Sequence, residues 1–245
     1  QLVERKNKEI LDSISYAKLI QAAMMPTEDY LHEKFKNIAI FYRPKDIVAG
    51  DFYWFEESED LKMIAVADCT GHGVPGAMVS VVCYNALNRS VREYGLTDPG
   101  QILDKTKEII LSELSRNDEN VKDGMDISLV VFDKNSNEIT WSGANNPLWL
   151  VTSASREIVE IKADKQPIGV HILSKSFTTH RMKLSTGDVL VLFTDGFADQ
   201  FGGAYGKKFK SANLKRLISE NSAIPMESFE KRLSTTFDEW TGNEE

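Results

Sequence analysis

Cysteine is scarce in this chain of 245 residues, which contains only Cys69 and Cys83. Two cysteines are too few for a disulfide framework, and their spacing matches no zinc motif. The scarcity favours a reducing environment, so the expected location is the cytoplasm. It also gives a structural zinc site little support.

Long apolar runs and an excess of positive charge are missing as well. The longest apolar stretches, such as Val79 to Cys83 and Val189 to Phe193, are far too short to cross a bilayer, which takes about 20 residues. No charged-then-apolar signal segment opens the sequence. Asp and Glu outnumber Lys and Arg by 37 to 29, and no basic stripe is interleaved with aromatic residues. We therefore expect no membrane span in this segment and no nucleic-acid partner.

Apolar residues make up 42% of the chain, which suffices for a substantial core. Residues 1–25 carry an apolar stripe at helical spacing, and Pro26 ends it. The stripe consists of Val3, Ile10, Ile14, Ala17 and Met24. Asn7 and Gln21 weaken it as a buried face, which favours a dimerising or signal-transmitting helix. A helix that packs on its own domain is the alternative.

The rest of the chain alternates between strand and helix patterns. Apolar and alternating runs predict strands at 38–43, 52–56, 61–67, 127–132, 138–142, 148–152, 157–161, 177–182 and 189–193. Amphipathic patterns predict helices at 75–94, 99–114, 211–220 and 225–240. Strands, then helices, then strands argue for antiparallel α+β layers rather than a parallel doubly wound fold.

Three aspartates, Asp51, Asp68 and Asp195, stand at the ends of β-prone runs and near glycine. A strand end holds a carboxylate on a rigid scaffold, and neighbouring glycines let carbonyls and water approach an ion closely. Each aspartate alone would be interpreted as a turn marker. Three such places in one chain, two with unusual flanking sequences, favour a hard-metal site.

The segment from Ala67 to Ala77 combines a strand, Asp68, a glycine-rich turn and a helix N-terminus. Asp68 can bind a divalent ion, the following carbonyl can add a ligand, and free N–H groups at the helix start can hold an anion. A Walker-type phosphate loop is excluded, because Gly71 and Gly73 are not followed by Gly-Lys-Ser/Thr. His72 either hydrogen-bonds the turn or takes part in proton transfer, and the sequence leaves both open.

Four stretches of the chain resemble motifs of the metal-dependent PPM serine/threonine phosphatases. They are Gly50 to Tyr53, Val66 to Gly73, Ser142 to Pro147 and Phe193 to Gly196. They occur in the family's order over about residues 20 to 240, and they are most similar to the bacterial SpoIIE-like (RsbU-type) branch. The resemblance implies an α+β fold: two antiparallel β-sheets in a sandwich flanked by α-helices, with an N-terminal linker helix. It also implies two Mn²⁺ or Mg²⁺ ions at one end of the sandwich.

By the same resemblance, Asp68 bridges the two metal ions, Cys69 binds through its backbone carbonyl, and Asp51 and Asp195 bind the ions or their waters. Two such ions lower the pKa of a water and position it for in-line attack on phosphorus, so no protein nucleophile is needed. This agrees with a sequence that has no cysteine-phosphatase signature and no serine elbow.

The chain departs from the family pattern in three places. Some relatives grip the substrate phosphate with an arginine; Arg43 and Lys45 lie near that place, although a solvated surface charge is the commoner role for each. Members generally end with a strand that opens on an Asp-Asp pair, and here Glu244 and Glu245 are poor substitutes, so one metal site is expected to be weakened. Ala144 stands about where some relatives carry an Asp implicated in a third metal, so no third ion is expected.

The predicted organisation is a linker helix at residues 1–25, which could form a coiled coil, and a phosphatase domain at 26–245 without the expected last strand. The predicted function is hydrolysis of phosphoserine or phosphothreonine on a regulatory protein, such as an anti-sigma-factor antagonist, in a bacterial cytoplasm. Further expected partners are an N-terminal sensor domain and a second copy of the chain, bound through the first helix. The alternatives are a catalytically silent signalling module and a hydrolase of small phosphoesters.

Overall fold

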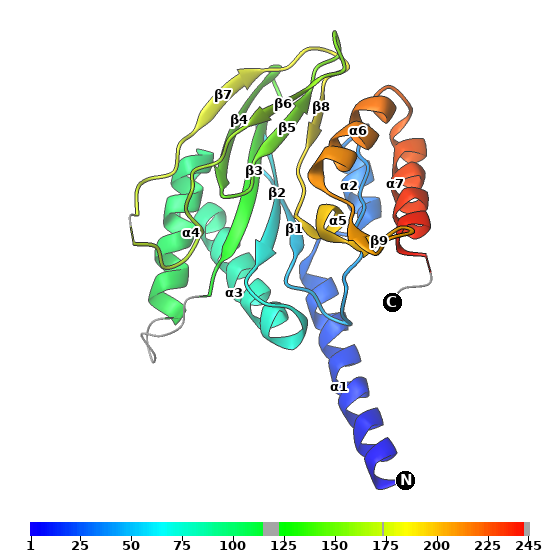
Figure 1. Cartoon of the computed structure of the whole chain (residues 1–245). Coiled ribbons are helices and arrows are strands. Elements are labelled where there is room, and N and C mark those ends of the chain that lie inside the picture. Colours follow the sequence, from blue (N-terminus) through cyan, green and yellow to red (C-terminus); the bar gives the residue numbers. More distant parts are fainter. Residues whose placement is uncertain (115–122, 173, 243–245) are drawn as a thin grey trace. The chain divides into compact units, whose positions relative to one another are not determined.

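A computed structural model of the chain describes residues 1–114, 123–172 and 174–242 (Figure 1). The chain divides into two compact units, each with its own sheet and apolar core. The larger unit comprises Gln1–Pro26, Pro44–Pro147 and Lys162–Leu184, and the smaller unit comprises Thr27–Arg43, Leu148–Ile161 and Ser185–Glu245. The expectation for Glu244 and Glu245 lies outside the described residues.

The larger unit is built on a five-stranded antiparallel sheet in the order β1-β2-β3-β4-β7. The strands are β1 (Phe52–Glu57), β2 (Leu61–Cys69), β3 (Met125–Asp133), β4 (Glu138–Ala144) and β7 (His180–Lys183). In β2, Met63, Ala65, Ala67 and Cys69 are buried, and the residues between them are partly exposed. This period of two assigns Asp68 to the face opposite these buried side chains.

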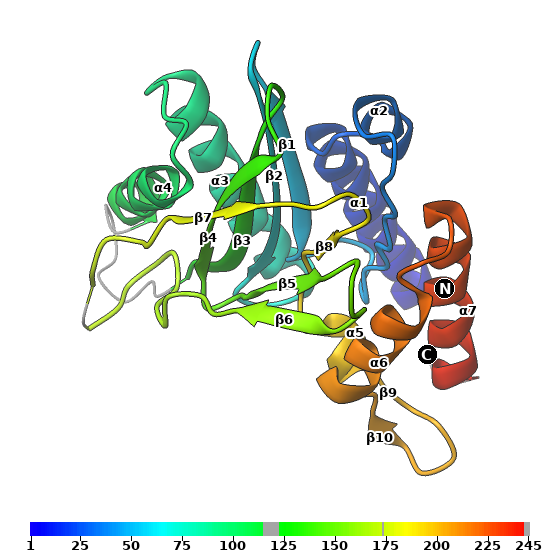
Figure 2. The same cartoon turned by 90° about the horizontal axis from the view of Figure 1, so that it is seen from above.

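Two helices, α3 (Gly73–Arg92) and α4 (Pro99–Leu114), cover one face of this sheet (Figure 2). The buried positions of α4 recur at helical spacing: Ile102, Leu103, Thr106, Ile109 and Ile110. Together with strand residues such as Trp54 and Leu129 they form a single core. The two predicted amphipathic helices are confirmed, α4 with the predicted bounds.

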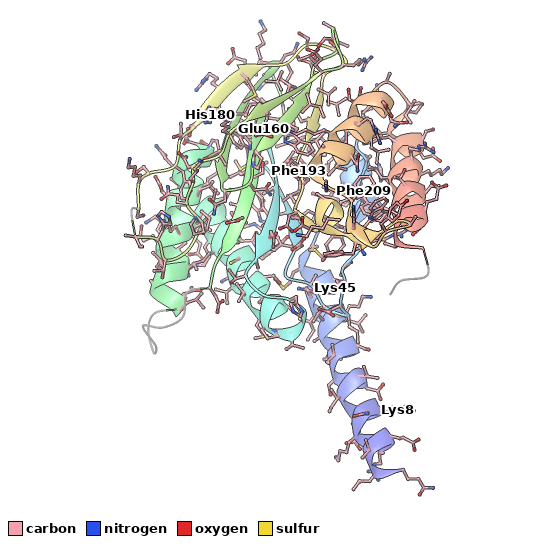
Figure 3. All side chains as sticks on the ribbon, viewed as in Figure 1. Lys8, Lys45, Glu160, His180, Phe193 and Phe209 are labelled. Atoms are coloured by element: carbon pink, nitrogen blue, oxygen red, sulfur yellow. The ribbon has the colours of Figure 1, made fainter. Side chains whose placement is uncertain are left out.

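Helix α1 (Leu2–Met24) also belongs to the larger unit, and its first turns, which include Lys8, project beyond the sheet (Figures 1 and 3). In this fully described helix, Gln21 is the only buried residue. Met24 and Met25, at its end, pack against the core. The predicted helix that ends before Pro26 is confirmed.

The smaller unit contains a three-stranded antiparallel sheet in the order β6-β5-β8. Its elements are α2 (Glu28–Lys34), β5 (Leu148–Val151), β6 (Ile158–Ile161), β8 (Val189–Val191), α5 (Gly196–Asp199), β9 (Phe201–Gly202), β10 (Lys207–Lys208), α6 (Ser211–Asn221) and α7 (Met226–Thr241). The core of this unit gathers Trp149, Phe209, Leu217 and Phe229. Phe193 packs against it, with its ring centroid 3.9 Å from that of Trp149 (Figure 3).

The predicted α+β class, with antiparallel sheets and flanking helices, is confirmed, but the strand predicted at 38–43 is wrong. The backbone N–H of Ile40 donates to Glu230 Oε2 at 3.1 Å, so a side chain takes the place of a strand partner. Phe41 packs edge-on against the ring of Phe197. Apolar packing and one side-chain bond therefore satisfy this β-prone segment without a ladder.

The strand predicted at 177–182 begins at His180 instead. The backbone N–H groups of Phe177 and Thr178 donate to the carboxylates of Asp104, at 3.0 Å, and Asp164, at 2.7 Å. These bonds divert the backbone from the ladder. The short helices α2 and α5 have no counterpart among the predicted elements. Among the described residues, no helix combines the length and the hydropathy needed to cross a membrane.

Candidate metal centre

Asp51 and Asp68 meet at one edge of the five-stranded sheet. Asp51 directly precedes β1, and Asp68 lies one residue before the end of β2. Phe52 pairs with Ala67 in the antiparallel register, so the next position outward places Asp51 opposite Asp68. Both aspartates are partly buried. The pairing of the two strands alone therefore brings these two predicted site residues together.

The thiol and the carbonyl of Cys69 have different surroundings. The thiol is buried in the core beside Cys83. Burial above all, then the contact with Cys83 and the charges of Asp51 and Asp68, raise the pKa of the Cys69 thiol well above its usual value. A thiol in that state supplies no thiolate at neutral pH. Of the two donor atoms, only the carbonyl oxygen suits a hard divalent ion.

Glycines let the backbone pack tightly around that carbonyl. A Cβ on Gly50 would lie 3.2 Å from the carbonyl oxygen of Cys69 and 2.8 Å from that of Gly71. A Cβ on Gly76, in the first turn of α3, would lie 2.4 Å from the same Gly71 oxygen. No side chain fits at such distances, so glycine is required where these three segments touch. The packing holds the Cys69 carbonyl beside Gly50 and Asp51.

A pocket of about 160 Å³ opens at this edge, lined by Asp68, Cys69, Thr70, Gly124, Met125, Asp126, Pro167 and Gly169. Asp126 lies opposite Asp68 in the β2–β3 register, so the two carboxylates share one face of the sheet. The side-chain amide of Asn145 donates to Asp126 Oδ1 at 2.9 Å. The hydroxyl of Thr70 donates to Asp123 Oδ1, also at 2.9 Å.

Asp126, which lines this pocket, is a residue that the sequence interpretation missed. A signal for Asp126 was present, because it opens the β-prone run at 127–132 just as Asp51 opens the run of β1. At this sheet edge, a carboxylate at the start of a strand indicates a site residue as well as one at the end of a strand does.

The donor set of this edge fits a hard divalent cation. Asp51 and Asp68 supply carboxylates and Cys69 supplies a carbonyl oxygen, the ligands that Mg²⁺ and Mn²⁺ prefer. Within the part of the chain that the structure describes, no group of three or more His, Cys, Asp or Glu residues is arranged to hold a metal ion. The edge therefore offers part of a coordination shell, and protein sites for such ions commonly keep several waters.

Asp195 lies in the smaller unit, between β8 and α5, where it is exposed. Its backbone carbonyl accepts the N–H of Asp199 at 2.8 Å, which closes the single turn of α5. Of the four predicted metal ligands, the structure brings together Asp51, Asp68 and Cys69. The metal-binding role of Asp195 stays a prediction.

Arg43 belongs to the smaller unit and forms a two-point ion pair with the carboxylate of Asp238. Its guanidinium also lies over the rings of Phe41 and Phe237, 5.4 and 5.7 Å from their centroids. Lys45 is an exposed residue of the larger unit (Figure 3). The phosphate-binding roles of Arg43 and Lys45 stay predictions, and Asp238 competes with any phosphate for Arg43.

His72 lies immediately before α3, and its ring is largely exposed. Its Nδ1 is 3.1 Å from Oδ2 of Asp46. Gly73 has positive φ, and a Cβ added there would lie 3.5 Å from the same carboxylate oxygen. A carboxylate partner orients the imidazole, which suits both roles that the sequence left open: a brace for the turn and a group that moves protons.

Comparison with known proteins assigns the chain to a family. The family model of Stage II sporulation protein E (SpoIIE) matches residues 58–245. The chain belongs to the SpoIIE family. The matched region contains Asp68, Cys69 and Asp195, whereas Asp51 precedes it. This confirms the predicted relation to the PPM phosphatases and their SpoIIE-like branch.

Individual relatives agree with this membership of the SpoIIE family. Phosphoserine phosphatase RsbU of Bacillus subtilis (strain 168) is 24% identical over 197 residues, which are 78% of this chain and 55% of RsbU. The chain thus spans about half the length of that relative. The PP2C domain of SiaA from Pseudomonas aeruginosa is 30% identical with a TM-score of 0.87, covering 98% of this chain and 93% of that domain. RsbX in complex with magnesium shares the fold, at 14% identity and a TM-score of 0.55 over 82% of this chain and 85% of RsbX.

Proposed function

We propose that this chain carries the catalytic domain of a metal-dependent protein serine/threonine phosphatase. The observation behind the proposal is the meeting of Asp51, Asp68 and the Cys69 carbonyl at one sheet edge, in a chain of the SpoIIE family. The name of RsbU, a phosphoserine phosphatase, and the PP2C type of the SiaA domain support it.

In this proposal the carboxylates and one backbone carbonyl of the chain bind the cations and fix their positions. Asp51 and Asp68 would hold the cations with their carboxylates, with Asp68 as the proposed shared ligand, and the Cys69 carbonyl, which packs against Gly50, would add an oxygen ligand. Asp195 adds a further carboxylate. Bound Mn²⁺ or Mg²⁺ supplies a water of lowered pKa and neutralises charge on the phosphoryl oxygens. Asp126 adds negative charge to the pocket, which strengthens the attraction of cations.

The proposed substrate is phosphoserine or phosphothreonine on a regulatory protein, such as an anti-sigma-factor antagonist. RsbU supports this choice, because its name specifies phosphoserine. We further propose that residues 1–25 link the phosphatase domain at 26–245 to an N-terminal sensor in a longer, cytoplasmic protein. The helical structure of α1 supports a linker role.

The proposal includes pairing with a second copy through α1. Apolar side chains on this helix that are more than half exposed are Leu2, Val3, Ile10, Leu11, Tyr16, Leu19 and Ile20. A partner helix would bury those on one side of α1, each contributing about 1.5–3 kcal/mol if fully buried and before entropic costs, which favours association. Light scattering on the chain with and without residues 1–17 tests this, because this cut leaves the buried Gln21 and the core contacts of Met24 and Met25 in place. We expect a dimer that becomes a monomer on removal, and a monomer in both cases would contradict the pairing.

A manganese-dependent phosphatase assay tests the function itself. The substrates are a phosphoserine peptide and para-nitrophenyl phosphate, and the proteins are the wild type, Asp68→Ala and the control Asp12→Ala on the exposed surface of α1. We expect the wild type and the control to release phosphate from the peptide and Asp68→Ala to be inactive. Activity on para-nitrophenyl phosphate alone would indicate a small-molecule hydrolase, and no activity from a full-length protein would indicate a silent signalling module.

A further inference from the structure

Thr70 joins the end of β2 to the start of β3 beside the metal pocket. Its backbone N–H donates to the carbonyl of Gly124 at 3.0 Å, and the N–H of Gly124 donates to Thr70 Oγ1 at 3.1 Å. The hydroxyl donates its own proton to Asp123 Oδ1 at 2.9 Å. Two bonds to one backbone and one bond to a carboxylate thus hold Thr70 at the mouth of the pocket that it lines.

The hydroxyl of Thr70 takes the place that a backbone carbonyl has in a sheet. Cys69 pairs with Met125 in the β2–β3 register, so Thr70 and Gly124 form the next pair outward (Figure 1). A hydrogen-bonded antiparallel pair exchanges two N–H···O=C bonds. Here the N–H of Thr70 makes one such bond, and its side-chain oxygen accepts the other N–H. The backbone can therefore leave the ladder at Gly71, whose φ is +86°.

The bond from Thr70 to Gly124 also fixes the direction of the Cys69 carbonyl. The C=O of Cys69 and the N–H of Thr70 belong to one planar trans peptide group, so they point in opposite directions. With the N–H held by β3, the carbonyl points to the β1 side, where a Cβ on Gly50 would lie 3.2 Å from its oxygen. The direction of this oxygen thus depends on how the next residue is held.

We propose that Thr70 is a positioning residue for the candidate metal centre: its hydroxyl, held between Asp123 and Gly124, keeps the Cys69 carbonyl directed at the cation. The inference rests on the proposed function, because it adds to that metal site a residue that binds no ion itself. A ligand that is already ordered costs less to engage than one that must be ordered on binding. Loss of the hydroxyl should therefore weaken cation binding without removing a ligand.

A second threonine of the larger unit makes the same kinds of bond away from the pocket. The hydroxyl of Thr179 donates to Asp98 Oδ1 at 2.6 Å and accepts the N–H of Gly100 at 3.0 Å. All three residues belong to the described part of the chain, and none of them lines the pocket. Removing the Thr179 hydroxyl therefore measures what such a cluster contributes to stability alone.

Titration calorimetry with Mn²⁺ on the intact chain tests the inference. Thr70→Val keeps the shape of the side chain and every charge of the pocket but removes the hydroxyl, Thr70→Ser keeps the hydroxyl, and Thr179→Val is the matched control. We expect Mn²⁺ affinity about fivefold weaker in Thr70→Val, the effect of losing about one net hydrogen bond, and unchanged in the other two. Melting temperatures should fall in both valine variants. Phosphopeptide turnover by Thr70→Val should recover at saturating Mn²⁺.

The outcomes separate this inference from the proposed function. Wild-type Mn²⁺ affinity in Thr70→Val would overturn the inference and leave the phosphatase proposal standing. Equal losses of affinity in both valine variants, or in Thr70→Val and Thr70→Ser, would do the same, because neither would trace the effect to this hydroxyl. A wild type that binds no Mn²⁺ would overturn both proposals. If Thr70→Val fails to fold, Thr70→Ala removes the same hydroxyl with a smaller side chain, and wild-type affinity in that variant would contradict the inference.

Discussion

The larger and the smaller unit present their predicted metal-binding carboxylates in different ways. In the larger unit, Asp51 and Asp68 stand on paired strands, over a backbone packed so closely that a Cβ on Gly50 would meet the Gly71 oxygen at 2.8 Å. In the smaller unit, Asp195 is exposed, between a strand of three residues and a helix of four. The backbone that carries Asp51 and Asp68 is held by strand pairing and close packing, whereas the backbone of Asp195 belongs to a short turn. Preorganisation is thus concentrated in one unit.

The largest expected effects on turnover come from removing one predicted metal-binding carboxylate from each unit. Asp51→Ala should lower manganese-dependent turnover by about a thousandfold, because metal ions supply several kcal/mol of transition-state stabilisation. Asp195→Ala should weaken metal affinity about 10- to 100-fold and be partly rescued by excess Mn²⁺. Phosphopeptide turnover over a manganese titration measures both. Equal losses, with rescue of neither variant, would remove the distinction between the units.

A matched pair of glycine substitutions probes the backbone beside each carboxylate. Gly50→Ala forces a Cβ against two carbonyl oxygens and should destabilise the fold by about 1–3 kcal/mol, with a loss of Mn²⁺ affinity. Gly196→Ala, beside Asp195, meets its nearest atom at 3.8 Å and should change stability by less than about 1 kcal/mol. Urea unfolding compares the two variants. Similar losses in both would show that the two sites are equally constrained.

Substitutions of Arg43 and Asp238 test whether the smaller unit also contributes to phosphate binding. Arg43→Ala should raise the KM for a phosphopeptide severalfold, and Asp238→Ala, which releases the guanidinium, should not raise it. Both should cost less than about 1 kcal/mol of stability, because the pair is solvent-exposed. Steady-state kinetics at saturating Mn²⁺ decide the matter. A KM unaffected by Arg43→Ala would limit this residue to its contacts with Asp238 and the two phenylalanine rings.

The smallest expected effect concerns a buried lysine of the larger unit, whose burial costs folding free energy. Lys107 is 5% exposed, its ammonium is 3.5 Å from Gln166 Oε1, and burial lowers its pKa, an effect that Asp104 opposes. A lysine whose pKa is lowered by folding destabilises the fold below that pKa, and this cost fades as pH rises toward the ordinary value of 10.5. Lys107→Met should therefore stabilise the chain by up to about 1 kcal/mol at pH 7. Melting temperatures at pH 7 and pH 10 should show the gain shrinking, and a gain that grows with pH would contradict this explanation.

The features that the sequence predicted are those with a local cause. Residues 99–114 form α4 because Pro99 suits the first helical position and the apolar residues recur at helical spacing. Asp51 and Asp68 were found because strand ends beside glycine are visible in the sequence, and their pairing follows from the adjacent strands β1 and β2.

The features that were missed depend on distant contacts or on very short elements. Helix α2 has seven residues and buries only Leu31, too little for a periodic pattern, although the Thr27 hydroxyl accepts the N–H of Tyr30 as an N-cap. The segment 38–43 has strand-like composition, yet its bond to Glu230 comes from nearly two hundred residues away along the chain. The bonds of Thr70 to Asp123 and Gly124 also join residues far apart in the chain, so no local pattern could have shown them.

The most direct test of the account is anomalous diffraction at the manganese edge from crystals of the chain grown with Mn²⁺. The account predicts a manganese peak bounded by the carboxylates of Asp51 and Asp68 and by the carbonyl oxygen of Cys69. It also predicts that the peak is absent in crystals of Asp68→Ala that keep the fold. Manganese bound elsewhere, with no peak at this edge in the wild type, would contradict it.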